Sequence, residues 1–281
     1  MHPAEIVERA LTEDIGSGDV TTELCVPADR RASGRFLVRE PVVVAGVELL
    51  PLLYDDLQIT APSGTCLSAG QEIANVRGSA RTLLTRERVA LNFLQRLCGI
   101  ATLARQYTDA VAGTGCRILD TRKTTPGLRQ LEKMAAHAGG VTNHRMGLYD
   151  AVLIKNNHIT AAGGVRAALE AAKESNLPVE IEVRSRPELH EALDCGATHL
   201  LLDNLSPAEA KEWIGIIGGR ATVELSGGIT LETVRAYAEA GADFISVGAI
   251  THSARAVDIH FELDKPPACP AQAGGMRNHA V

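Results

Sequence analysis

The sequence predicts an α/β protein in which a small, mostly antiparallel sheet precedes a parallel α/β barrel. From Ser33 to Val76, short β-branched runs are separated by Gly, Pro and Ser, which is typical of an antiparallel sheet. After Gly113, apolar strand-like runs alternate with helix-like segments, as in parallel strands joined by right-handed crossovers. These units lack the glycine fingerprint of a dinucleotide-binding sheet, which favours a barrel.

The N-terminal elements follow from local signals. Residues 4–13 read as a short helix, and Gly16 and Gly18 mark the turn after it. A long helix is expected over 79–112, with Ser79 or Thr85 as its cap and Gly113 at its end. Its apolar residues recur at helical spacing: Ala90, Leu94, Leu97, Ala101 and Ala104.

The barrel is expected to contain six strands, at 117–121, 151–155, 179–184, 198–203, 222–226 and 243–248. The intervening helices are expected near 127–138, 164–175, 187–194, 207–216 and 231–240. Two of them have a cap followed by proline, at Thr125-Pro126 and Ser206-Pro207. Six strands are two short of a complete barrel, so the barrel is incomplete or borrows a strand. The expected domains are 1–112, joined by a returning segment 253–264, and 113–252; the Pro-, Ala- and Gly-rich tail 265–281 is expected to be disordered.

Composition excludes several classes of protein. The apolar fraction is 45 % and the aromatic fraction 3 %, so the core must be largely aliphatic. A net charge of −6 argues against a nucleic-acid or anionic-membrane binder. The cysteines form no CxxC pair, which disfavours a zinc ribbon and indicates reduced core thiols. The N-terminal segment lacks an apolar leader, and we therefore expect a cytoplasmic protein.

Polar residues follow the predicted barrel strands at their carboxyl ends, where barrel enzymes place their chemistry. The strands supply, in order, Asp120 with Arg122 and Lys123, Lys155, Glu182, Asp203, Ser226-Gly227-Gly228, and Gly248. The cations suit an anionic ligand, and the glycines allow backbone N–H groups to approach a phosphate. Carboxylates nearby suit the oxocarbenium-like carbon of a sugar-phosphate transfer.

Each residue also has a simpler interpretation. Arg122 and Lys123 could be solvated loop cations. Lys155 could be paired with Glu182 or Asp203, and these two acids could be counter-ions and nothing more. His144 is as consistent with a structural role as with a place in the site, beside Arg145.

The motifs together resemble those of the quinolinate phosphoribosyltransferase family. The resemblance covers residues 13 to about 260, and the run from 120 to 159 is its most specific part. It rests on EDIGSGDVTT, ERVALNFLQRLCGIAT, DTRKTTPGLR, GGVTNHRMGLYDAVLIKNNHI, EIEV, LLLDN, SGGI and ISVGAITHSARAVDI. Cys98 stands where the family has Ser, VTN replaces a more Gly-rich loop, and the tail after Asp264 matches nothing.

The resemblance implies an N-terminal α/β sandwich, an incomplete barrel of six or seven strands, and a homodimer or higher oligomer. It implies that quinolinate and phosphoribosyl pyrophosphate give nicotinate mononucleotide, CO2 and pyrophosphate, with Mg2+. Lys123, Lys155, Glu182 and Asp203 fall on catalytic positions. Glu182 and Asp203 also match acids near the metal, directly or through water or pyrophosphate. The substrate-binding positions are Arg88 (reaching across subunits), Arg122, Lys123, His144, Arg145, Lys155, Glu182, Asp203, Ser226, Gly227, Gly228 and Gly248.

Three other functions fit parts of this pattern. A relative of the same fold that accompanies molybdate-transport genes is disfavoured by the LIKNNHI run around Lys155. A nicotinate phosphoribosyltransferase needs to hold only one carboxylate, so the full set of cations argues against it. A catalytically silent sugar-phosphate sensor would not need both Glu182 and Asp203.

Overall fold

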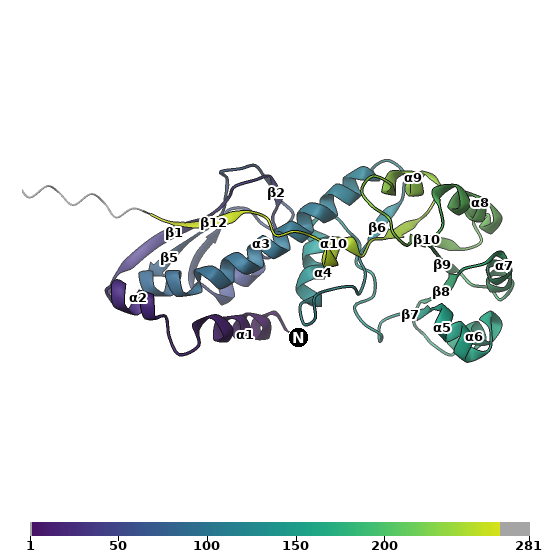
Figure 1. Ribbon diagram of the computed structural model, residues 1–281, viewed down its shortest axis with the longest axis horizontal. Coiled ribbons are helices and arrows are strands. Elements are labelled where there is room, and N and C mark those ends of the chain that lie inside the picture. The colour runs from purple at the N-terminus through teal and green to yellow at the C-terminus, as the bar shows by residue number, and fades with distance from the viewer. Residues whose placement is uncertain (1, 265–281) are drawn as a thin grey trace, which may run out of the picture.

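The computed structural model describes residues 2–264, which form an antiparallel sheet region and a parallel-sheet region joined by one long helix (Figure 1). The tail 265–281, predicted to be disordered, lies outside the described residues. Within 2–264, no helix is both long and apolar enough to cross a membrane.

The first region is a four-stranded antiparallel sheet in the order β12-β1-β5-β3. The last strand pairs with the first, placing Phe261 opposite Phe36, so the chain returns to its N-terminal sheet. A two-stranded ribbon of β2 and β4 lies beside it. The elements are α1 (Pro3–Ile15), α2 (Val20–Cys25), β1 (Arg31–Val38), β2 (Val42–Val43), a 3-10 helix (Val47–Leu52), β3 (Asp56–Ile59), β4 (Cys66–Leu67), β5 (Glu72–Ser79) and β12 (Ile259–Leu263).

The second region is a six-stranded parallel sheet in the order β6-β11-β10-β9-β8-β7, which confirms an incomplete barrel. Among residues 2–264 no strand closes it between β6 and β7; an isolated bridge joins Leu119 to Thr142 there. Its strands are β6 (Arg117–Leu119), β7 (Val152–Ile154), β8 (Val179–Val183), β9 (His199–Asp203), β10 (Thr222–Ser226) and β11 (Phe244–Ser246). Its helices are α4 (Arg129–Ala138), α5 (Asn156–Ala162), α6 (Val165–Ala172), α7 (Arg186–Asp194), α8 (Pro207–Ile217), α9 (Val234–Glu239) and α10 (Ala249–His252).

The long helix α3 (Ala80–Ala110) runs from the antiparallel sheet to the barrel and packs against both (Figure 1). Its expected apolar stripe, Ala90 to Ala104, is buried, and the core around it is mostly aliphatic, as the composition predicts. Burial of this apolar stripe stabilises the helix more than the intrinsic helix propensity of its residues does.

The structure corrects several local predictions. α4 begins at Arg129, not at Pro126, because the Thr125 N–H and hydroxyl both bond to Glu132 and residues 126–128 form a turn. The run after Pro41 is strand only at Val42–Val43 before a 3-10 helix. The short helices α2, α5 and α10 were not predicted, since none is long enough to show a helical period.

The close packing of α3 leaves no space for a side chain at Gly99. A Cβ on Gly99 would lie 2.0 Å from the backbone oxygen of Arg255, whereas a Cβ on Gly215, inside α8, would meet nothing within 4 Å. We expect Gly99→Ala to lower the free energy of unfolding by about 1–3 kcal/mol. Gly215→Ala should raise it by about 0.4–1 kcal/mol. Thermal unfolding followed by circular dichroism would show opposite shifts in Tm; equal shifts would contradict this packing.

Candidate active site

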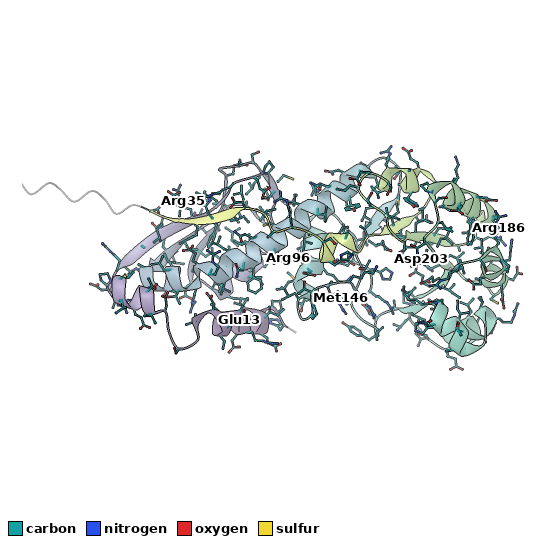
Figure 2. All side chains as sticks on the ribbon, in the orientation of Figure 1. Glu13, Arg35, Arg96, Met146, Arg186 and Asp203 are labelled. Atoms are coloured by element: carbon teal, nitrogen blue, oxygen red, sulfur yellow. The ribbon has the colours of Figure 1, made fainter. Side chains whose placement is uncertain are left out.

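A cavity of about 340 Å³ opens at the carboxyl ends of the parallel strands. Its size suits a small ligand. Figure 2 places Asp203 on the barrel, well away from Arg35 of the antiparallel sheet. The lining residues are Thr121, Arg122, Lys123, His144, Arg145, Leu153, Lys155, Leu201, Asp203, Glu224, Ser226 and Ser246. The cavity therefore unites seven of the predicted site residues: Arg122, Lys123, His144, Arg145, Lys155, Asp203 and Ser226.

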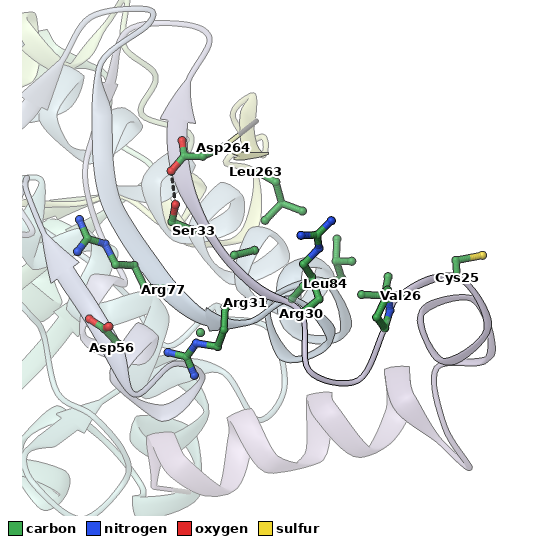
Figure 3. Close-up of a pocket in the computed structure, with 14 residues that line it drawn as sticks. Cys25, Val26, Arg30, Arg31, Ser33, Asp56, Arg77, Leu84, Leu263 and Asp264 are labelled. Carbon is green, nitrogen blue, oxygen red and sulfur yellow. Dashed lines mark hydrogen bonds between the residues drawn. The ribbon is translucent and has the colours of Figure 1, made fainter. Parts of the chain in front are cut away.

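A larger hollow of about 790 Å³ lies at the edge of the antiparallel sheet (Figure 3). Arg30, Arg31 and Arg77 line it, together with Asp264, which accepts a hydrogen bond from Ser33. It contains none of the predicted site residues. Volume alone does not mark a site, and the converging charges favour the smaller cavity at the barrel.

Four cations come from two segments that face each other across the cavity: Arg122 and Lys123 after β6, and Arg145 and Lys155 on either side of β7. Burial lowers the pKa of Arg145, and the positive charge of Arg122 lowers it further. Like charges gathered in this way favour an anionic ligand between them.

A buried ion pair between Lys133 and Asp120 holds these segments together. Asp120 is 0 % exposed and Lys133 is 1 % exposed. Asp120 also accepts hydrogen bonds from the His144 N–H at 2.8 Å and from the Asn143 side chain at 2.6 Å. Lys133 Nζ donates to the His144 carbonyl at 2.8 Å, and burial lowers its pKa while Asp120 opposes that change. One pair thus joins the end of β6, α4 and the His144 loop.

A second buried acid, Glu132, fixes the loop that carries Lys123. Arg96 on α3 donates to Glu132 Oε1 at 2.8 Å, and Thr125 donates its N–H and hydroxyl to the same carboxylate. The Thr251 hydroxyl donates to the Lys123 carbonyl at 2.8 Å. The loop that carries Lys123 is therefore held in place by a network of polar groups whose hydrogen bonds are formed.

The two predicted acids have different surroundings. Glu182 is 3 % exposed and lies 3.3 Å from Lys155 Nζ and 2.9 Å from Arg184, so both its oxygens are paired. This is the counter-ion arrangement that the sequence left open, and Glu182 does not line the cavity. Asp203 is half-buried at the cavity, where it accepts a hydrogen bond from Asn204 at 2.6 Å.

The glycines lie beside the cavity rather than in its lining. Gly227 and Gly228 have positive φ angles of 99° and 61°, and among the described residues no acceptor meets their N–H groups. A Cβ on Gly227 would lie 2.2 Å from Asn204 Oδ1, and one on Gly248 2.9 Å from Lys123 Cδ. The backbone here is free to bind an anion, and the glycines also allow their neighbours to pack.

Two acids that the sequence analysis missed contact His144. Its Nε2 lies 3.3 Å from Glu180 and 3.5 Å from Glu224. Burial lowers the pKa of His144, but the two carboxylates outweigh this and raise it to about 9. Strand alternation could have revealed both acids, because Glu180 shares the inward face of β8 with Glu182, and Glu224 that of β10 with Ser226.

Arg88 lies outside the cavity, exposed on α3. Nearby, Asp19 caps α2 by accepting from the Thr22 N–H and also accepts from the Thr85 hydroxyl, each at 2.9 Å. The EDIGSGDVTT segment is thereby tied to the turn of α3 that precedes Arg88. Within one described chain, Arg88 and the four cavity cations do not form one site.

Comparison with known proteins gives one consistent match. The family model described as "Quinolinate phosphoribosyl transferase, C-terminal domain" matches residues 100–262, and its N-terminal counterpart matches 19–98. A Mycobacterium leprae relative, nicotinate-nucleotide pyrophosphorylase [carboxylating], is 40 % identical over 92 % of this chain and 96 % of its own. Quinolinate phosphoribosyltransferase [decarboxylating] 1b of Nicotiana tabacum is 38 % identical over 92 % of this chain and 81 % of its own.

A solved structure agrees with these sequence matches. The nicotinate-nucleotide pyrophosphorylase of Ehrlichia chaffeensis superposes with a TM-score of 0.90 at 34 % identity, covering 94 % of this chain and 99 % of its own.

The buried pair under the site can be tested by removing one partner. We expect Asp120→Ala to lower the free energy of unfolding by about 3–5 kcal/mol, because Lys133 is left buried without its counter-ion. Glu170→Ala, which breaks an exposed pair with Lys173, should cost less than about 1 kcal/mol. Denaturant unfolding would measure both changes, and similar small losses would show that the Asp120 pair does not hold the site together.

Proposed function

The chain belongs to the quinolinate phosphoribosyltransferase family, and we propose that the cavity at the ends of its parallel strands is where it joins quinolinate to phosphoribosyl pyrophosphate. Its reaction is decarboxylating phosphoribosyl transfer in NAD biosynthesis, which yields nicotinate mononucleotide, CO2 and pyrophosphate. The single observation that carries the site is the meeting of Arg122, Lys123, Arg145 and Lys155 on one cavity.

The cations explain how the substrates are held. Quinolinate has two carboxylates, which arginine binds in a bidentate manner, while lysine acts as a point charge. We assign Arg122 and Arg145 to the dicarboxylate; His144 lies beside them, with its Nε2 facing Glu180 and Glu224. The unpaired N–H groups of Gly227 and Gly228, with Ser226, suit the phosphate of the sugar donor, as does the turn at Gly248.

The reaction then depends on position and charge. The ring nitrogen of quinolinate attacks C1 of the ribose as pyrophosphate leaves. Lys123 and Lys155 stabilise the departing charge, and the carboxylates of Asp203 and Glu182 stabilise the positive character that develops at C1. The quaternised nitrogen then accepts the electron pair that remains when the adjacent carboxylate is lost as CO2.

We also propose Mg2+ as the cofactor of this step, since its preferred ligands are oxygens and the substrate brings a pyrophosphate. Asp203 lines the cavity, and Asn204 binds one of its two oxygens, which leaves the other for a metal. Glu182 would act through water or pyrophosphate, because Lys155 and Arg184 hold its oxygens. When bound, Mg2+ would neutralise the leaving group.

A homodimer would complete the site. Arg88 is exposed next to α2, where Val20 is 67 % and Leu24 81 % exposed, and Leu148 and Tyr149 beside the barrel are each 75 % exposed. Apolar side chains of this size on the surface favour a protein interface. In the proposed dimer, Arg88 of one subunit reaches the cavity of the other. We place the enzyme in the cytoplasm, in keeping with the unpaired cysteines of the described residues.

The direct test supplies phosphoribosyl pyrophosphate and Mg2+ with quinolinate in one reaction and nicotinate in another. Nicotinate mononucleotide and CO2 should form from quinolinate alone.

Lys155→Ala should lower turnover at least about tenfold with unchanged folding, since a cavity cation is lost, whereas Lys173→Ala, which removes an exposed lysine, should have no effect. Product from nicotinate alone would contradict the substrate assignment, and normal turnover in Lys155→Ala would contradict the site.

The shared site predicts complementation between inactive subunits. Arg88→Ala and Lys155→Ala proteins, each inactive alone, should regain part of the activity after mixing, because a hybrid dimer contains one cavity with both residues intact. Subunit exchange would be verified by native mass spectrometry, and turnover measured before and after. Verified exchange without any rescue would exclude a contribution of Arg88 across the interface.

A further inference from the structure

An acid lies where an anion must bind. Glu224, on the inward face of β10, lines the same cavity as Arg122, Arg145 and Lys155, and its side chain is only 5 % exposed. A fully ionised carboxylate there would repel the carboxylates of the substrate. The position is explained if the acid carries a proton that the reaction uses.

The hydrogen bonds of His144 show where such a proton can lie. The two carboxylates raise the pKa of His144, but the Arg145 N–H donates to Nδ1 at 2.7 Å and needs a lone pair there, so the ring is held neutral with its proton on Nε2. Nε2 faces both Glu180 and Glu224. A further proton on this cluster must therefore lie on the carboxylate pair.

The same tautomer argues against a metal. Among residues 2–264, these three side chains form the one group of potential ligands close enough to share an ion, with ligand atoms within 4.8 Å of one another. An imidazole that binds a metal through Nε2 carries its proton on Nδ1. Here that position accepts a hydrogen bond, so the cluster is arranged for a proton.

A second cavity gives the cluster access to solvent from the other end of the barrel. It measures about 290 Å³ and is lined by Pro178, Val179, His199 and Thr222 at the amino ends of the strands. Glu180 lines only this lower cavity, whereas His144 and Glu224 line both. His144 and Glu224 therefore lie between a substrate side and a solvent side, as does Arg145, which also lines both cavities.

We propose that Glu224 is the general acid that protonates the ring carbon from which CO2 departs. The bond from that carbon to its carboxylate breaks, and the electron pair stays on the carbon beside the positively charged nitrogen. This electron pair then takes the proton of the Glu224 carboxyl group, which leaves Glu224 ionised. Glu224 regains a proton from the solvent of the lower cavity, which its side chain also lines.

Glu180 and His144 are positioning residues in this scheme, because Nε2–H of His144 holds the two carboxyl groups together. The other charged groups around the cluster include Arg145, which lines both cavities, and His199 on the solvent side. On the substrate side they are Arg122, Lys123, Lys155 and Asp203. Asp120 and Lys133 bind the His144 backbone.

This inference rests on the proposed function, and Glu224→Gln tests it because glutamine keeps the shape but cannot donate an acidic proton. In a rapid-quench single turnover, wild-type enzyme should release pyrophosphate and CO2 together. Glu224→Gln should release pyrophosphate within about threefold of the wild-type rate and CO2 at least about 10²-fold more slowly. Glu170→Gln, the same chemical change at an exposed acid outside both cavities, should match the wild type.

A second measurement applies even if the variant turns over poorly. In D2O, wild-type enzyme should exchange the proton on carbon 2 of nicotinate mononucleotide, followed by proton NMR, by the reverse of the protonation step. Glu224→Gln should exchange only at the buffer rate while its Kd for nicotinate mononucleotide, measured by calorimetry, stays within about threefold of wild type.

The proposal is overturned if Glu224→Gln slows both products equally, keeps wild-type exchange, or if wild-type enzyme exchanges no faster than buffer. Failure of the proposed function would look different, since wild-type enzyme would then form neither product from quinolinate.

Discussion

The buried pair between Asp120 and Lys133 is the interaction on which the site depends. Removing two charges from water is costly unless their remaining hydrogen bonds are satisfied, and here they are. Asp120 accepts hydrogen bonds from the N–H of His144 and from the side chain of Asn143, and Lys133 donates one to the His144 carbonyl. The pair therefore fixes where β6 ends relative to the loop that carries Arg145. The backbone bridge between Leu119 and Thr142 supports the same contact.

The architecture also explains why the barrel can bind a strongly anionic substrate. Strands β6 and β7 are not paired with each other, and the loop between them bridges β6 only at Leu119 and Thr142. That opening is flanked by Arg122 on one side and by Arg145 and Lys155 on the other. The cations gather at the place where the sheet is incomplete, and the acids Glu180, Glu182 and Glu224 lie on its inward face. The barrel thus combines a cationic rim at the cavity with acids on the inward face of its strands.

Cations in the same stretch of sequence have different tasks. Arg129 and Lys133 are drawn inward to backbone carbonyls and to Asp120, whereas Arg122 and Lys123 remain at the cavity. Position on α4 decides this, since its buried side faces β6 and the His144 loop. Lys155 is intermediate between the buried and the cavity-lining cations, because its side chain is 49 % exposed and yet pairs with Glu182. A ligand carboxylate or phosphate would compete with Glu182 for it.

The sequence by itself determined the alternation of strands and helices, the six parallel strands, the aliphatic core and the family. These follow from periodicity and from motifs that are local in the chain. Only the tertiary structure decided that Lys133 is structural, that Glu182 is fully paired, and that Glu180 and Glu224 meet at His144. Such outcomes depend on which inward-facing side chains from different strands come within hydrogen-bond distance. That distance is set by how the sheet curves and closes, and no local pattern in the sequence determines this.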